Sequence, residues 1–193
     1  MAKGTKAKKA IAFAFRLISA LLFLTYGILC IRFIFGDEYH GDGFDPVSFC
    51  VDFLTSISFI SLAAVLIFEK YQIIFKIASY LIAGSHIYYA CNSLVLLLVL
   101  THRFDIIAKS MILSLFFNLL NSAAFFIFSA VYGKSKINPL YRFLPASIML
   151  TCFVLDLLGI NVRHAGQDII LTLSILFCSA YPLFESKEEY CYI

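Results

Sequence analysis

Residues 11–35 read IAFAFRLISALLFLTYGILCIRFIF, a run in which the only charged residues are Arg16 and Arg32. At about 1.5 Å per residue, a helix of this length spans roughly 37 Å, which exceeds the hydrocarbon layer of a bilayer at about 30 Å. The run follows a basic start, as in a secretory signal, but it is too long and has no small-residue cleavage site. We therefore predict an uncleaved membrane anchor.

Five further apolar stretches follow the first. They cover residues 47–68, 73–100, 106–132, 143–160 and 169–184. The last stretch forms a helix of only about 24 Å, which is marginal for crossing a bilayer alone. We predict an all-α, polytopic transmembrane helical bundle with six spans, and four spans plus a re-entrant pair is the alternative.

The composition excludes a soluble domain. The chain is 62% hydrophobic and 14% charged, with a mean hydropathy of +0.92, whereas soluble domains are about 45–50% apolar. The net charge of +3 does not indicate nucleic-acid binding, because the basic residues are split among short loops. We predict a basic N-terminus (1–10), one transmembrane domain (11–184) in contact with the lipid bilayer, and a tail (185–193).

The basic residues are distributed unevenly between the two predicted faces of the membrane. If both termini are cytoplasmic, the cytoplasmic face holds Lys3, Lys6, Lys8, Lys9, Arg16, Lys70, Lys76, Lys134, Lys136 and Arg142. The opposite face holds Arg32, Arg103, Lys109 and Arg163. Cytoplasmic loops carry an excess of lysine and arginine. We therefore predict cytoplasmic termini, in an endomembrane (ER or Golgi) or the plasma membrane.

Polar residues recur at helical spacing in the third and fourth stretches. Hydrocarbon makes each of them costly unless it faces another helix or water. The predicted polar intramembrane face comprises His86, Asn92, Ser114, Asn118, Asn121 and Ser122. Two interpretations stay open: these side chains join helices through interhelical hydrogen bonds, or they line a polar path.

An acidic loop separates the first two stretches on the predicted outer face. It contains Asp37, Glu38, His40, Asp42 and Asp45. Their oxygens would suit a divalent cation, but the spacing does not match an EF-hand, and the glycines and Pro46 favour a solvated irregular turn. We predict no metal site, because the four histidines also lack the spacing of zinc or haem ligands.

Asp52, Cys30 and Cys50 do not by themselves indicate a particular function. Asp52 lies near the start of the second stretch, where its carboxylate can reach the headgroups, and we interpret it as a marker of depth. Cys30 and Cys50 flank the acidic loop and could form a disulfide, or they pack as small apolar residues.

The sequence has no phosphate-binding loop, nucleophile elbow or HExxH motif. We therefore expect a non-enzymatic protein without a cofactor.

One pattern in the first stretch resembles a known family. Arg16-Leu17, Phe23-Leu24 and Gly27-Ile28 occur at the spacing R-L-x5-F-L-x2-G-I. This is similar to the opening helix of DoxX-like proteins and of the surfeit-type receptors that carry soluble cargo out of the endoplasmic reticulum. The polar outer loop and the aromatic third stretch are similar in outline. The resemblance covers the first four stretches and implies a cargo-receptor function.

The tail ends in YCYI, a match to the tyrosine sorting signal Y-x-x-Φ through Tyr190 and Ile193. A free hydrophobic carboxyl terminus also suits a PDZ-type groove. We therefore predict a trafficking receptor or membrane scaffold that acts through the acidic loop and the tail, with protein partners or as a homo-oligomer. The alternatives are a small-solute or ion channel or transporter, and a structural subunit of a larger membrane complex.

Overall fold

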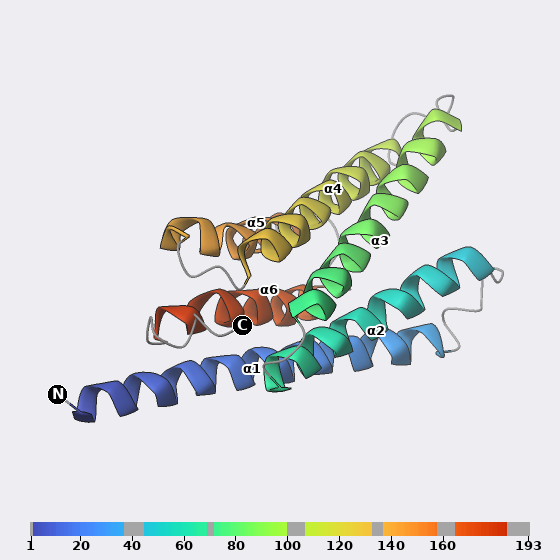
Figure 1. Cartoon of the computed structure of the whole chain (residues 1–193). Coiled ribbons are helices and arrows are strands. Elements are labelled where there is room, and N and C mark those ends of the chain that lie inside the picture. Colours follow the sequence, from blue (N-terminus) through green and yellow to red (C-terminus); the bar gives the residue numbers. More distant parts are fainter. Residues whose placement is uncertain are drawn as a thin grey trace.

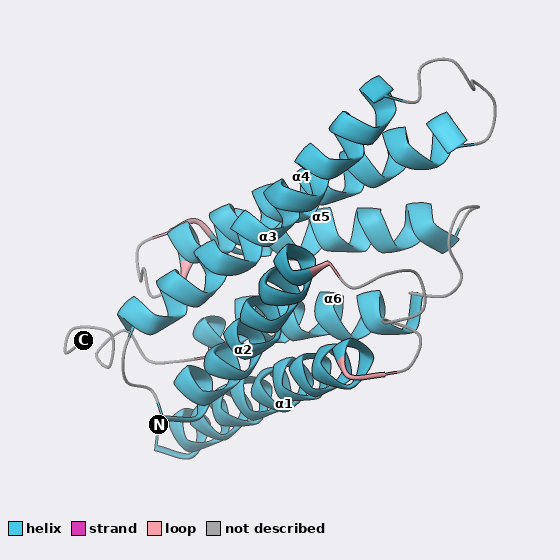
Figure 2. Cartoon of the chain, turned by 90° about the vertical axis from the view of Figure 1, so that its right-hand side faces the viewer, coloured by secondary structure: helices cyan, strands magenta, loops and turns pink. Residues whose placement is uncertain are grey.

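The computed structural model describes residues 2–36, 45–68, 72–99, 107–132, 137–157 and 165–184, and these residues form helices without a strand (Figure 2). The elements are α1 (Ala2–Ile34), α2 (Pro46–Phe68), α3 (Gln72–Val99), α4 (Ile107–Val131), α5 (Pro139–Leu157), α6 (Ala165–Ala180) and the short 3-10 helix η2 (Tyr181–Leu183). The predicted all-α class is confirmed. Helix α1 begins well before the apolar stretch, because residues 2–10 are rich in the strong helix formers alanine and lysine.

Four of the described helices are long and apolar enough to cross a membrane, with spans at Lys6–Ile34, Pro46–Phe68, Gln72–Val99 and Ser110–Val131. Large apolar side chains point away from the bundle, for example Ile73 and Val99, which are 73% and 70% exposed. Lipid tails accept such side chains without penalty. The chain is therefore a multi-pass integral membrane protein.

Helices α5 and α6 are shorter, with 19 and 16 residues. At 1.5 Å per residue they measure about 28 and 24 Å. Both are helical, as predicted. Whether they cross the bilayer or re-enter it stays a prediction.

Two helices begin with the same local arrangement, a capping side chain followed by proline. Asp45 accepts a hydrogen bond from the Val47 amide before α2, and Asn138 accepts one from the Leu140 amide before α5, each at 3.0 Å. The cap satisfies an amide that no helical carbonyl reaches, and a proline in the first turn has no amide to satisfy. Helix α5 therefore starts four residues before the predicted position 143.

The helices form a closed ring in which each packs against its neighbours in the chain and α6 packs against α1 (Figures 1 and 2). Ring contacts show that two of these pairs are antiparallel. Phe15 in α1 contacts Phe177 in α6 at 5.3 Å between ring centroids, and Phe35 contacts Phe49 at the start of α2 at 5.9 Å. The end of α1 and the start of α2 therefore lie together at one end of the bundle (Figure 1).

Aromatic side chains fill the centre of the ring. Phe23 in α1 contacts Phe128 in α4 at 6.2 Å, and Phe59 in α2 contacts Phe125 in α4 at 5.8 Å between ring centroids. All four side chains are buried. Because these contacts join helices that are not adjacent in the ring, the middle of the bundle is packed.

Candidate functional site

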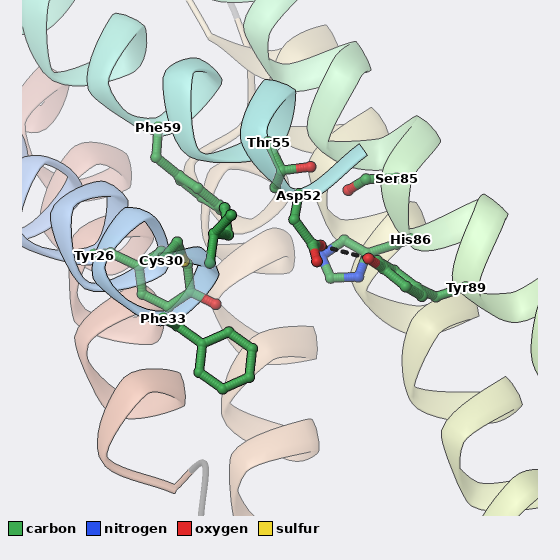
Figure 3. Close-up of a pocket in the computed structure, with 10 residues that line it drawn as sticks. Tyr26, Cys30, Phe33, Asp52, Thr55, Phe59, Ser85, His86 and Tyr89 are labelled. Carbon is green, nitrogen blue, oxygen red and sulfur yellow. Dashed lines mark hydrogen bonds between the residues drawn. The ribbon is translucent and has the colours of Figure 1, made fainter. Parts of the chain in front are cut away.

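A half-enclosed pocket of about 170 Å³ lies between α1, α2 and α3, and we call it the Asp52 pocket (Figure 3). It is lined by Tyr26, Cys30, Phe33, Ile34, Asp52, Thr55, Phe59, Ser85, His86 and Tyr89. The α1 residues come from the last third of that helix, and the α2 residues lie between Asp52 and Phe59, from the first half of α2 to just past its middle. The pocket therefore occupies the half of the bundle in which α1 ends.

Asp52 and Tyr89 join α2 to α3 at this pocket. The Tyr89 hydroxyl donates a hydrogen bond to Asp52 Oδ1, shown as the dashed line in Figure 3. Asp52 lies six residues after Pro46, the first residue of α2, which corresponds to about 9 Å along the helix. Figure 3 shows the His86 ring beside this pair. A carboxylate and an imidazole thus reach one cavity inside the membrane spans.

His86 also belongs to a hydrogen-bonded chain between α3 and α4. Its Nδ1 lies 3.1 Å from Asn118 Oδ1, and Asn118 Nδ2 donates to the Ser114 carbonyl at 2.9 Å. Because the Asn118 amide nitrogen faces that carbonyl, its oxygen accepts from His86, and His86 Nδ1 carries the hydrogen. The Ser114 and Ser93 hydroxyls are 3.0 Å apart. These hydrogen bonds from α4 hold the His86 ring in place at the wall of the pocket.

Phe59 lines the pocket on the side that faces the aromatic core of the bundle, and we call this side the floor of the pocket. Its ring lies 4.6 Å from the Tyr26 ring and 5.8 Å from the Phe125 ring, centroid to centroid, and its side chain is 1% exposed. The His86 and Phe125 rings are also stacked at 6.2 Å. The aromatic core of the bundle therefore begins directly below the pocket.

The structure brings together half of the predicted polar face. His86, Ser114 and Asn118 are joined by hydrogen bonds, with Ser93 as a further member. Of the other predicted residues, Ser122 is buried and Asn92 is half-buried.

Asn121 differs from Asn118, although the two are one helical turn apart. Its Oδ1 is buried and has no hydrogen-bond partner. The predicted polar face thus contains a short hydrogen-bonded network around Asn118 and, one turn away, the Asn121 side-chain oxygen, which has no hydrogen-bond partner.

Most residues predicted in the outer loop and the tail lie outside the described residues. These are Asp37, Glu38, His40, Asp42, Tyr190 and Ile193. Asp45 is described, and it caps α2. The Ser48 hydroxyl and the Val47 amide donate hydrogen bonds to its carboxylate, which holds the pKa of Asp45 below its ordinary value. The role seen for Asp45 is therefore helix capping.

The sequence pattern identifies His86 as a candidate, but it does not indicate that Asp52, Tyr89 and the aromatic residues of α1 and α2 share a pocket with it. The position of Asp52 in the sequence predicts only a marker of depth, and the structure adds that its carboxylate accepts a hydrogen bond from Tyr89 on α3. A signal was available, because Asp52, Thr55 and Phe59 share one face of a helix at intervals of three and four. Cys30 lines the pocket, and neither it nor Cys50 forms a disulfide. Among the described residues, no three His, Cys, Asp or Glu side chains gather as a metal site would require.

Comparisons with protein-family models, with curated proteins and with solved structures gave no match. The resemblance to DoxX-like proteins and cargo receptors stays a prediction. The structure gives two residues of that pattern a packing role, because Phe23 is buried in the aromatic core and Gly27 lies against α2.

Replacing Asn118 with leucine is expected to destabilise the bundle, whereas the same change at Asn121 is expected to have little effect. The first substitution removes the partners of His86 and Ser114, and interhelical hydrogen bonds in membranes contribute about 0.6 kcal/mol on average and up to about 1.7. The second removes an amide whose oxygen has no partner. Thermal unfolding in mild detergent, reported by a thiol-reactive dye that reaches the buried Cys152 and Cys178, measures both. Equal losses would contradict this assignment.

Proposed function

We propose that this protein is a small-solute transporter and that the Asp52 pocket is its solute-binding site. The observation that carries the proposal is that Asp52 and His86, both within membrane spans, line the same half-enclosed cavity. Ionisable side chains are rare in transmembrane helices because hydrocarbon solvates them poorly, and they mark solute and proton pathways. Interhelical hydrogen bonding alone would not require a cavity beside them.

The aromatic floor favours a transporter over a continuously open channel. Phe59 separates the pocket from the packed centre, where Phe23, Phe125 and Phe128 lie. A solute that enters the pocket therefore needs these helices to move before it can leave on the other side. This arrangement suits alternating access around a site within the bundle.

The orientation of the pocket follows from the two ends of the described chain. Phe184 packs on Phe15 at 5.4 Å between ring centroids, so the end of the described chain lies beside the first half of α1. The basic residues near the N-terminus favour the cytoplasm for that end. In this proposal both termini are cytoplasmic, and the pocket lies toward the opposite face of an endomembrane or the plasma membrane.

The trafficking-receptor hypothesis depends on the acidic loop and on the tail. Apart from Asp45, which caps α2, the predicted residues of both segments lie outside the described residues. The described geometry therefore favours solute transport as the first function to test.

The test uses purified protein in liposomes and a panel of radiolabelled cationic, neutral and anionic solutes with up to about eight non-hydrogen atoms. We expect uptake of at least one solute above that of empty liposomes, and at least a tenfold loss in Asp52→Asn, equivalent to about 1.4 kcal/mol. Ser61→Ala is the matched control, because that hydroxyl lies on α2 but bonds within its own helix to Ile57.

Two results would overturn the proposal. One is uptake that is unchanged in Asp52→Asn. The other is the absence of uptake for every solute by protein that stays monodisperse, especially if secretory cargo co-purifies with it in fixed proportion.

A further inference from the structure

We infer that the Asp52 pocket binds a small organic ammonium ion that carries N–H groups. This inference rests on the proposed function and names the chemical class of its solute. Among the ten described residues that line the pocket, Asp52 is the one carboxylic acid, and none is lysine or arginine. The bond from Tyr89 holds the carboxylate in place at the cavity wall. The formal charge of the wall therefore complements a cation.

The hydroxyl groups of the wall add acceptors. Thr55 donates its hydrogen to the Val51 carbonyl at 2.7 Å, and Ser85 donates to the Ile82 carbonyl at 2.7 Å, each within its own helix. A hydroxyl has one hydrogen and two lone pairs, so a group that already donates presents lone pairs to other partners. The Tyr89 hydrogen is likewise directed at Asp52. The polar part of the wall thus favours a ligand that donates hydrogen bonds.

Aromatic rings supply the rest of the cation site. Tyr26, Phe33, Phe59 and Tyr89 line the pocket, and Figure 3 shows the Tyr26 and Phe33 rings across from the Asp52 carboxylate. The face of an aromatic ring attracts a cation, and the attraction grows when the site excludes water. A carboxylate facing aromatic rings therefore recognises an organic ammonium ion in preference to a neutral or anionic solute.

The volume limits the size of this ion. An engineered cavity of about 150 Å³ in another protein holds one benzene molecule, and the Asp52 pocket measures about 170 Å³. A solute with roughly four to eight non-hydrogen atoms therefore fits. Protonated 2-aminoethanol has this size and chemistry. The same group is also the headgroup of phosphatidylethanolamine, so a free solute and a lipid headgroup share the recognition chemistry.

The experiment uses Cys30 as a reporter, because this residue lines the pocket. A full-length variant keeps Cys30 and replaces the other five cysteines with alanine or serine. It is placed in phosphatidylglycerol nanodiscs and treated with a small neutral methanethiosulfonate. We expect 2-aminoethanol at neutral pH to slow the modification of Cys30 at least fivefold. Ethylene glycol and glycolate, which are its neutral and anionic counterparts, are expected to have no effect.

Substitution of the acid completes the test. Asp52→Asn is expected to abolish the protection by 2-aminoethanol. Tyr89→Phe keeps the ring and loses the hydroxyl that holds the carboxylate, so it is expected to weaken the protection. This variant replaces Asp52→Asn in the test if Asp52→Asn is not monodisperse. Slow modification in phosphatidylethanolamine nanodiscs without added solute would identify a lipid headgroup as the source of the ammonium group.

The outcomes separate the two proposals. Equal protection by glycol or glycolate, or protection that persists in Asp52→Asn, overturns the ammonium assignment and leaves a solute site in place. Protection by tetramethylammonium but not by 2-aminoethanol overturns the role of the N–H groups. Failure of the transporter proposal shows separately, as the absence of uptake into liposomes, whereas a Cys30 that 2-aminoethanol does not protect overturns the ammonium assignment alone.

Discussion

Replacing Gly27 with leucine is expected to prevent α1 from packing against α2, so that little folded bundle is recovered. A Cβ atom at position 27 would lie 2.8 Å from Ile60 Cγ1 and 3.0 Å from the Ser56 carbonyl oxygen. Cγ1 is bound to the branched Cβ of Ile60, whose rotation is restricted in a helix, and the backbone oxygen moves only with its helix. Small residues permit this close approach of helices in membranes. Glycine is therefore required here by the distance between α1 and α2.

A graded series of substitutions measures how strongly the close contact at Gly27 limits the size of the side chain. Gly27→Ala is expected to lower the free energy of unfolding by about 1–3 kcal/mol, the usual cost of an overpacked core. Gly84→Ala and Gly84→Leu are the matched controls, because no atom lies within 4 Å of a Cβ built at that position. Fluorescence-detected size exclusion and thiol-dye unfolding at Cys152 and Cys178 measure recovery and stability. Equal losses at positions 27 and 84 would disprove the packing argument.

Phe59→Ala is expected to be the second most damaging change, because it removes the floor of the Asp52 pocket. The ring contacts those of Tyr26, Phe23 and Phe125 and is 1% exposed. Truncation of a buried phenylalanine to alanine costs about 3–5 kcal/mol through lost contacts and the cavity that remains. The pocket also becomes continuous with the space left in the core, so a passive leak of small solutes is expected.

The control for Phe59 is Phe116→Ala. Phe116 lies on α4 and is 49% exposed, with its ring next to that of Phe117. Its loss is expected to cost less than about 1 kcal/mol, because lipid replaces most of its contacts. Unfolding by the thiol dye and leak of a trapped small solute from liposomes measure the two variants. A stable and tight Phe59→Ala protein would show that this ring is not the floor of the site.

The two asparagines of α4 show what the spacing of polar residues in the sequence could and could not predict. Helical spacing placed Asn118 and Asn121 on one polar face, and the spacing is correct within α4. It could not distinguish the residue that bonds to His86 from the one whose oxygen has no partner. That difference depends on the rotation and offset of α3 against α4, which no local pattern records.

Hydropathy and length alone determined that this is a helical membrane protein and set most helix bounds to within a few residues. Both properties are local: they depend on 20 to 30 consecutive residues and the thickness of a bilayer. The role of Asp52 was decided by tertiary structure. Its distance from the end of α2 can be counted from the sequence, but its partner Tyr89 lies 37 residues away on another helix. Helix faces meet through side-chain packing between distant segments, and only the folded ring brings a carboxylate, an imidazole and four aromatic rings around one cavity.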